Sequence, residues 1–103
     1  MPPRSDPAVP SWTFLSNHAL VLVCVAADPV IRMRDIAGRV GITERGVHRI
    51  VKELEASGYL TAVRDGRRKR YLVHADKQLR HPLTAHRTVR QLVELGAGGR
   101  PKK

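Results

Sequence analysis

Hydrophobic positions in the first part of the chain predict a helix that is apolar on every side. Leu15 and Leu20 flank Ser16 with the spacing of a hydrophobic staple around an N-cap, so the helix should begin at Ser16. It should stop near residue 27, before Pro29, and residues 19–27 are all apolar. A surface helix of a monomer shows one apolar stripe rather than a full circumference. This helix is therefore either central to the core or shared with a partner subunit.

A shorter helix is predicted next. Residues 30–33 alternate weakly between apolar and polar and are consistent with a short strand. A helix over about residues 34–40 follows, and Gly41 should end it, as glycine does just past a helix. The side chains that this helix should bury are Ile36, Ala37 and Val40.

The third predicted helix has the clearest amphipathic pattern. Thr43 can cap its N-terminus, and the helix should run to about residue 57, before Gly58. The apolar positions follow the spacing i, i+3, i+4, i+7. They are Val47, Ile50, Val51 and Leu54.

The period then changes to alternation, which predicts a β-hairpin. Residues 59–64 and 68–74 have the pattern of two strands. Asp65-Gly66 is a strong hairpin signal, because both residue types tolerate positive φ. The loop could have two to four residues, so the register stays open. Tyr71 and Leu72 should pack the hairpin onto the rest of the domain.

After Pro82 a last helix is predicted over about residues 84–95, ending before Gly96. One face of it carries Ala85, Val89, Leu92 and Val93. The whole pattern predicts a mainly α domain with one small hairpin over residues 12–95. Residues 1–11, with four of the seven prolines, should be a disordered arm, and residues 96–103 a flexible basic tail.

Composition narrows the function classes. The 103 residues are enough for one domain with a thin core. Lys and Arg outnumber Asp and Glu by 19 to 9, which gives a net charge of +10 and favours nucleic acid as the partner over an anionic membrane. No apolar run reaches the roughly twenty residues of a membrane span, and no secretory signal is visible. A cytoplasmic, nucleoid-associated location is therefore expected.

The residue inventory argues against an enzyme and against a cofactor. The single cysteine, Cys24, lies inside the apolar helix, where a small core residue is expected. The five histidines show no ligand spacing with carboxylates or thiols, so no metal site is predicted. Phosphate-binding glycine loops and nucleophile elbows are missing from the sequence.

The second and third predicted helices have the features of a helix-turn-helix. Ala37 lies where the two helices must approach closely, Gly41 lies in the turn, and Val47 lies where the later helix packs back. Residues 33–52 resemble the helix-turn-helix of bacterial and archaeal regulators. With the basic hairpin, residues 16–74 resemble the winged helix-turn-helix domains of MarR-like and ArsR-like regulators. The resemblance implies a recognition helix in the major groove and a hairpin, the wing, on the DNA backbone or in the minor groove.

The residues themselves support DNA reading by the third helix. Opposite its apolar stripe lie four bases at i, i+3, i+4, i+7, and an α-helix with such a face fits the major groove. The first turn should face the base edges, and Arg34 near the start of the preceding helix could contact a phosphate. The alternative is an ordinary solvated helix face. The candidates on these two helices are Arg34, Thr43, Glu44, Arg45, Gly46, His48, Arg49 and Lys52.

The predicted hairpin tip is the second basic cluster. Arginine suits both phosphates and narrow, negatively charged minor grooves. The alternative, a solubilising turn, would not require five bases within seven residues. They are Arg64, Arg67, Arg68, Lys69 and Arg70.

These patterns predict a sequence-specific DNA-binding transcriptional regulator that binds an inverted repeat of double-stranded DNA as a homodimer. An architectural DNA-binding protein and a protein-interaction winged helix are the alternatives. The apolar first helix and the apolar face of the last helix predict a dimer interface, since one thin core cannot easily cover both. Its expected members are Trp12, Phe14, Leu20, Val23, Val89, Leu92 and Val93. The sequence names no small-molecule effector.

Overall fold

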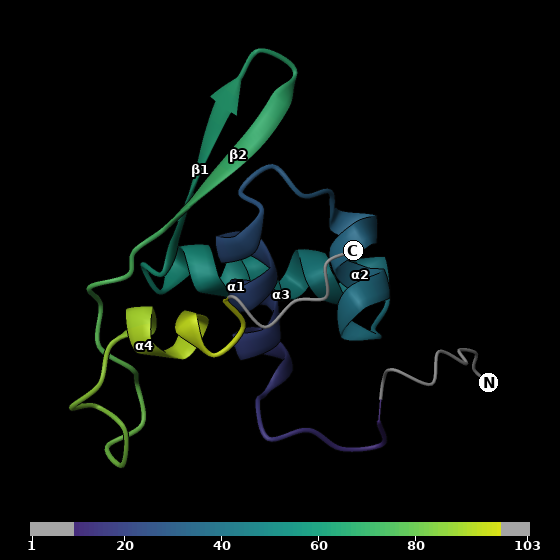
Figure 1. The fold of residues 1–103 in the computed structure, drawn as a ribbon. Helices are drawn as coiled ribbons and strands as arrows, with labels where there is room; N and C mark the ends of the chain where they lie inside the picture. Colours follow the sequence, from purple (N-terminus) through teal and green to yellow (C-terminus); the bar gives the residue numbers. More distant parts are fainter. Residues whose placement is uncertain (1–9, 98–103) are drawn as a thin grey trace.

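The computed structural model describes residues 10–97, so most of the arm predicted for residues 1–11 and most of the tail predicted for residues 96–103 lie outside the described residues. Three helices form the body, a hairpin projects from it, and a short fourth helix covers one side (Figure 1). The elements in chain order are α1 (Asn17–Ala27), α2 (Met33–Val40), α3 (Glu44–Ala56), β1 (Leu60–Asp65), β2 (Arg68–Val73) and α4 (Val89–Glu94). This arrangement is a winged helix-turn-helix with an additional C-terminal helix, which confirms the predicted fold class.

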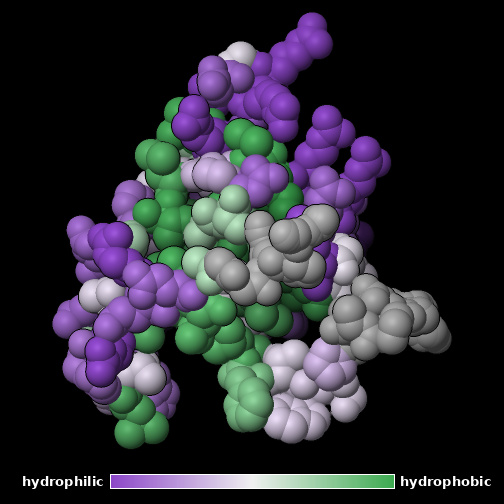
Figure 2. All heavy atoms as spheres, viewed as in Figure 1, coloured by the Kyte–Doolittle hydropathy of each residue, from purple (hydrophilic) through white to green (hydrophobic). Residues whose placement is uncertain are grey.

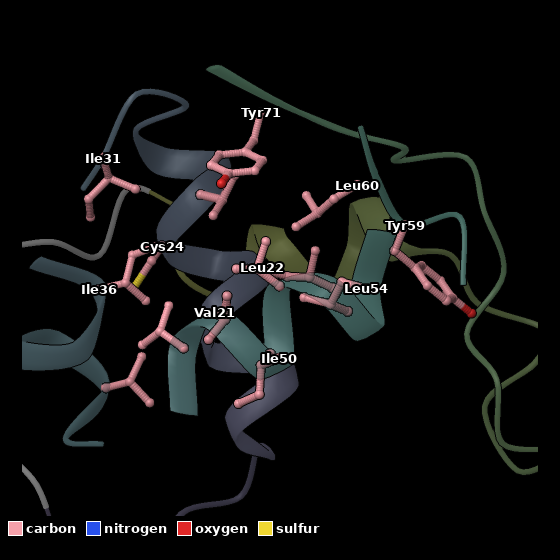
Figure 3. Close-up of a cluster of buried hydrophobic side chains, with 14 of the residues drawn as sticks. Val21, Leu22, Cys24, Ile31, Ile36, Ile50, Leu54, Tyr59, Leu60 and Tyr71 are labelled. Carbon is pink, nitrogen blue, oxygen red and sulfur yellow. The ribbon is translucent and has the colours of Figure 1, made fainter. Parts of the chain in front are cut away.

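Helix α1 lies at the centre of the core. Its N-cap is confirmed, because the Ser16 hydroxyl accepts a hydrogen bond from the Ala19 amide (3.1 Å). The helix contacts α2, α3, α4 and β2, which together surround it. Its apolar circumference is therefore explained mainly by its own subunit. Its buried residues are Val21, Leu22, Cys24 and Val25, of which Figure 3 labels the first three.

The helix-turn-helix is formed by α2 and α3, as the sequence predicts. Gly41 caps α2 in the left-handed region, at φ +89°, and its amide donates to the Ala37 carbonyl oxygen (2.8 Å). The Thr43 hydroxyl caps α3 by accepting from the Gly46 amide (3.0 Å). The two predicted apolar stripes are both buried against α1 and each other. They are Ile36, Ala37 and Val40 of α2, and Val47, Ile50, Val51 and Leu54 of α3.

The short strand predicted over residues 30–33 is wrong. Asp28 turns the chain there, since its carbonyl oxygen accepts from the Ile31 amide (3.0 Å) and its carboxylate from the Val30 amide (3.2 Å). Helix α2 then begins at Met33. The loop between α1 and α2 still contacts the hairpin through one backbone hydrogen bond, which the Tyr71 amide donates to the Pro29 carbonyl oxygen (2.9 Å).

The hairpin has a two-residue loop, Gly66-Arg67, because Asp65 pairs with Arg68 at the end of the ladder. Gly66 has φ +65°, and no non-glycine residue in the described part of the chain has positive φ. Positive φ at the first loop position alone is the pattern of a type II′ turn. Asp65 therefore belongs to the strand, and glycine alone supplies the unusual conformation.

Only one of the two side chains expected to fix the hairpin does so. Tyr71 is 3% exposed and packs into the core, whereas Leu72 is 47% exposed. Successive residues of a strand face opposite sides of the sheet, so both could not point inward. The expectation for Leu72 was therefore wrong.

The last helix is much shorter than the predicted 84–95. Thr88 is extended (φ −111°, ψ 167°), forms a β-bridge with Gln78 and opens a capping box with Gln91. These contacts fix the helix start after Thr88, so Ala85 lies in the preceding turns rather than on a helical face. Beyond α4, Gly96 lies so close to the Val23 side chain that a Cβ there would collide with it.

No helix in the part of the chain that the structure describes is long and apolar enough to cross a membrane.

Two glycines of the helix-turn-helix, Gly38 and Gly41, should respond oppositely to alanine. Gly41→Ala forces a side chain into the left-handed region and should lower the free energy of unfolding by about 1–2 kcal/mol. Gly38→Ala, in the middle of α2 with open space around its Cα, should raise it by roughly 0.5–1 kcal/mol. Urea unfolding of both variants checks the pair. Equal effects would contradict the assigned role of Gly41.

Candidate nucleic-acid interface

The outward side of α3 carries the bases that the sequence assigned to it. Burial of the apolar stripe fixes the helix rotation, so Arg45, His48, Arg49 and Lys52 are all exposed. Thr43 and Glu44 are exposed at the start of the helix, and Gly46 is half-buried. A Cβ at Gly46 would lie 3.2 Å from the Thr43 hydroxyl that caps the helix. The absence of a side chain at Gly46 therefore leaves room for the Thr43 cap as well as space at the surface.

Two of these bases have acidic neighbours one helical turn away. His48 Nε2 lies 3.9 Å from Glu44 Oε2, and Arg49 Nη1 lies 3.5 Å from Glu53 Oε2. The four side chains of these pairs are 50–66% exposed, so each ion pair contributes little to stability. Arg45 and Lys52 form no ion pair within residues 10–97, so their charge is not locally offset.

Glu53 also joins α3 to α1. Its Oε1 lies 2.6 Å from His18 Nε2 at the start of α1. The hydrogen bond from His18, with a smaller contribution from the charge of Arg49, holds the pKa of the Glu53 carboxyl below its ordinary value of 4.5. The same carboxylate thus contacts an arginine of the candidate interface and a residue of the central helix.

A groove of about 610 Å³ lies between the hairpin and the first turns of α2 and α3. We call it the wing groove. It brings together residues that are far apart in the sequence, and Tyr71 also lines it. The charged and histidine side chains that line it are Arg32, Arg34, Glu44, His48, Arg67, Arg68 and Lys69.

Arg32 was missed by the sequence analysis. It is the N-cap residue of α2, exposed and without a side-chain capping bond. A single arginine before a short helix gives no signal in the sequence. Only the approach of the hairpin to the start of α2 shows that Arg32 and Arg34 share a groove with the wing.

The hairpin displays its bases on both faces. Arg64 pairs with Lys69 in the ladder, on the same face as buried Tyr71, while Arg70 lies on the other face with Nη2 4.0 Å from Asp65 Oδ2. The Arg68 guanidinium donates to the Val30 carbonyl oxygen (3.4 Å) and so ties the hairpin to the body. All five basic side chains are exposed. Hydrophilic side chains gather at the projecting hairpin, and hydrophobic ones lie nearer the body (Figure 2).

Other kinds of site find little support among residues 10–97. No group of three or more His, Cys, Asp or Glu side chains in that range could hold a metal ion. The Cys24 thiol is buried in the core, and burial raises its pKa above the ordinary value. A raised pKa leaves little thiolate at neutral pH, which is the opposite of what a nucleophile requires.

The residues expected at a dimer interface differ widely in exposure. Trp12 is 67% and Phe14 91% exposed, whereas Val89 is fully buried at 0%. Val89 belongs to the core of its own subunit and has no surface left for a partner. The remaining members, Leu20, Val23, Leu92 and Val93, are half-buried.

A comparison with known protein families agrees with this geometry. Residues 18–61 match the family described as "Winged helix-turn-helix DNA-binding". This stretch runs from α1 through α2 and α3 to the start of β1, so the similarity covers the three helices of the body and reaches the beginning of the hairpin. No curated protein sequence gives a significant match.

One solved structure with detectable similarity is that of the PcaV transcriptional regulator from Streptomyces coelicolor in complex with its natural ligand. The two chains are 31% identical, and the TM-score is 0.49. The match covers 63% of this chain and 48% of that chain, so it spans about half the length of that regulator.

The contact between Glu53 and His18 predicts a pH effect on stability. A carboxyl whose pKa is lowered in the folded state stabilises the fold above its unfolded pKa, and this stabilisation disappears as the pH falls through the folded pKa. Glu53→Gln should therefore lose less stability than the wild type between about pH 5.5 and pH 3, as measured by urea unfolding at several pH values. Glu94→Gln, on the exposed side of α4, is the control and should follow the wild-type profile. A Glu53→Gln profile parallel to that of the wild type would contradict the assignment.

Proposed function

We propose that this winged helix-turn-helix chain is a sequence-specific transcriptional regulator that binds double-stranded DNA as a homodimer. The observation that carries the proposal is the wing groove, where the bases of the hairpin lie beside the first turns of α2 and α3. A surface of this kind can contact the phosphate backbone while the outer face of α3 contacts base edges. The net charge of +10 adds a long-range attraction for DNA.

The exposed side of α3 supports base reading. The guanidinium group of Arg45 or Arg49 can form a bidentate contact with O6 and N7 of guanine. The Glu44 carboxylate can accept from N4 of cytosine, and Lys52, further along the helix, suits a phosphate. Arg49 now lies 3.5 Å from Glu53, whose side chain is half exposed. Giving up this exposed ion pair for a contact with DNA would cost little free energy.

The wing and the start of α2 would hold the DNA backbone. Arg67 and Lys69 line one side of the wing groove, and Arg32 and Arg34 line the other. Contacts to phosphates fix the register of the protein on the duplex without reading its sequence. Arg64 and Arg70 extend the basic surface along the hairpin toward the backbone or the minor groove.

A homodimer would present two copies of α3 to the same side of the duplex. Two-fold symmetry in the protein corresponds to an inverted repeat in the DNA, with half-sites about one helical turn, or a multiple of it, apart. The exposed Trp12 and Phe14 and the half-buried Leu20, Val23, Leu92 and Val93 are the available apolar surfaces.

The high net charge also favours a second candidate, an architectural protein that binds DNA without sequence preference. Selection of bound sequences from a random duplex pool separates the two functions. A regulator should enrich one inverted repeat and keep it bound in excess random competitor, whereas an architectural protein should enrich nothing. Absence of any binding would favour a protein-interaction winged helix instead.

The first mutational prediction concerns base reading. On the selected site, Arg45→Ala should weaken binding by about 1–3 kcal/mol and relax the preference at one base pair, and Arg49→Ala should act likewise at a neighbouring pair. Fluorescence anisotropy on the site and its single-base variants measures both effects. Arg87→Ala removes the same charge from an exposed position before α4 and should leave base preference unchanged. A folded Arg45→Ala/Arg49→Ala variant with wild-type affinity and preference would refute the assignment.

The second mutational prediction concerns the wing. Arg67→Ala/Lys69→Ala should weaken binding to specific and random DNA alike, since phosphate contacts carry no sequence information. The slope of log affinity against log salt should become shallower by up to about 0.9 for each phosphate that the variant no longer neutralises. The matched control is Arg87→Ala/Arg90→Ala, which lowers the net charge equally but lies outside the wing groove. Identical slopes for the two double variants would mean that the wing does not touch the duplex.

A further inference from the structure

A second groove, of about 520 Å³, lies between α1, the C-terminal half of α3 and α4, and we call it the α1–α4 groove. The side chains of His18, Glu53 and Arg80 stand at its polar part. The apolar residues that line it and keep exposed surface are Ala19, Ala56, Leu79 and Leu92. A largely apolar groove of this size on a small domain is suited to large apolar side chains.

The segment that precedes α1 carries such side chains and leaves them in solvent. The Trp12 and Phe14 rings contact each other edge to face, with centroids 5.0 Å apart. They are nevertheless 67% and 91% exposed. The segment leading into α1 projects away from the body of the molecule (Figure 1). No other element of the described chain covers these aromatic rings.

We propose that Trp12 and Phe14 of a second copy of this chain occupy the α1–α4 groove, and that the two copies exchange these segments reciprocally. The segment is joined to α1 at Ser16, which itself lines the groove. A two-fold axis near Ser16 therefore places the partner's segment beside the groove. An extended chain spans about 3.3 Å per residue, so the four residues 12–15 reach roughly 13 Å from that axis. The inference rests on the homodimer of the proposed function and identifies the contact that forms it.

Charge explains why the contact should form at this place. Each copy carries a net charge of +10, so two copies repel one another over most of their surface. Residues 10–15 are uncharged, and among the residues that line the groove the negative charge of Glu53 offsets the positive charge of Arg80. The DNA-binding surface is also left accessible, because the residues of the wing groove do not line the α1–α4 groove.

The exchanged aromatic side chains supply a large part of the area that a stable dimer needs. An aromatic side chain buries about 150–250 Å², so the four of two copies contribute roughly 600–1,000 Å². The grooves that receive them add to this area, and specific interfaces typically bury roughly 1,200–2,000 Å² in total. Aromatic side chains buried in a pocket are also among the residues that contribute most of the binding free energy of an interface.

Trp12 is the only tryptophan of the chain, so its fluorescence reports directly on the exchange. Emission should shift to shorter wavelength as the protein concentration rises, in step with the appearance of dimer in sedimentation equilibrium. A blue-shifted emission that is independent of concentration would show that each segment covers its own groove, and would overturn the proposal. So would dimerisation without any change in emission.

Variants on the two sides of the contact give an independent test. Trp12→Ala/Phe14→Ala removes the inserting side chains, and Ala56→Arg places a long charged side chain in the groove from an exposed position at the end of α3. Each variant alone should sediment as a monomer. The control Ala27→Arg, an exposed position at the end of α1 outside the groove, should remain dimeric. Circular dichroism should show that each variant is folded, so that loss of the dimer is not loss of the fold.

Mixing the two defective variants provides complementation. A heterodimer keeps one intact segment and one intact groove, so the mixture should recover part of the dimer that neither variant forms alone. If Trp12→Ala/Phe14→Ala or Ala56→Arg dimerises as the wild type does and still binds the inverted repeat, this contact is wrong and the proposed function stands. A wild type that is monomeric and binds single half-sites would contradict the homodimer itself.

Discussion

Burial of α1 by every neighbouring element is the constraint on which the rest of this structure depends. Helices α2, α3 and α4 and strand β2 all contact it, and it supplies four of the buried side chains of the core. In a domain of about 100 residues the interior is thin, so no second cluster could replace this one. The orientation of α3, and therefore the direction in which Arg45 and Arg49 point, follows from how its apolar stripe packs on α1.

The core also separates two surfaces of opposite character. On one side the hairpin and the starts of α2 and α3 collect basic side chains around the wing groove. On the other, α1, the end of α3 and α4 leave an apolar groove with few charges. Like charges gathered on one surface repel one another, and binding of a polyanion relieves this repulsion. The same segregation that favours DNA on the first surface favours protein contact on the second.

Local signals were sufficient wherever one residue decides a backbone conformation. Ser16 and Thr43 were predicted as N-caps and Gly41 as a C-cap, and each forms the expected hydrogen bond or left-handed conformation. They could be predicted because the responsible atoms lie within a few residues of one another. The start of α4 has the opposite property, because it is set by a bridge between Thr88 and Gln78, ten residues apart. The turn after α1 is local, but the bonds that Asp28 accepts from Val30 and Ile31 outweighed a weak alternation of apolar residues.

The sequence by itself determined the order of the helices, the buried stripes of α2 and α3, the basic side of α3 and the charge of the hairpin. These properties follow from periodicity, capping and composition, which are local or additive. Only the tertiary structure decided that Arg32 and Arg34 share a groove with Arg67 and Lys69, that Glu53 links Arg49 to His18, and that Val89 is buried while Trp12 and Phe14 are not. Such relations depend on how close residues far apart in the chain come to one another. That proximity is set by the packing of the elements around α1, which no pattern along the chain records.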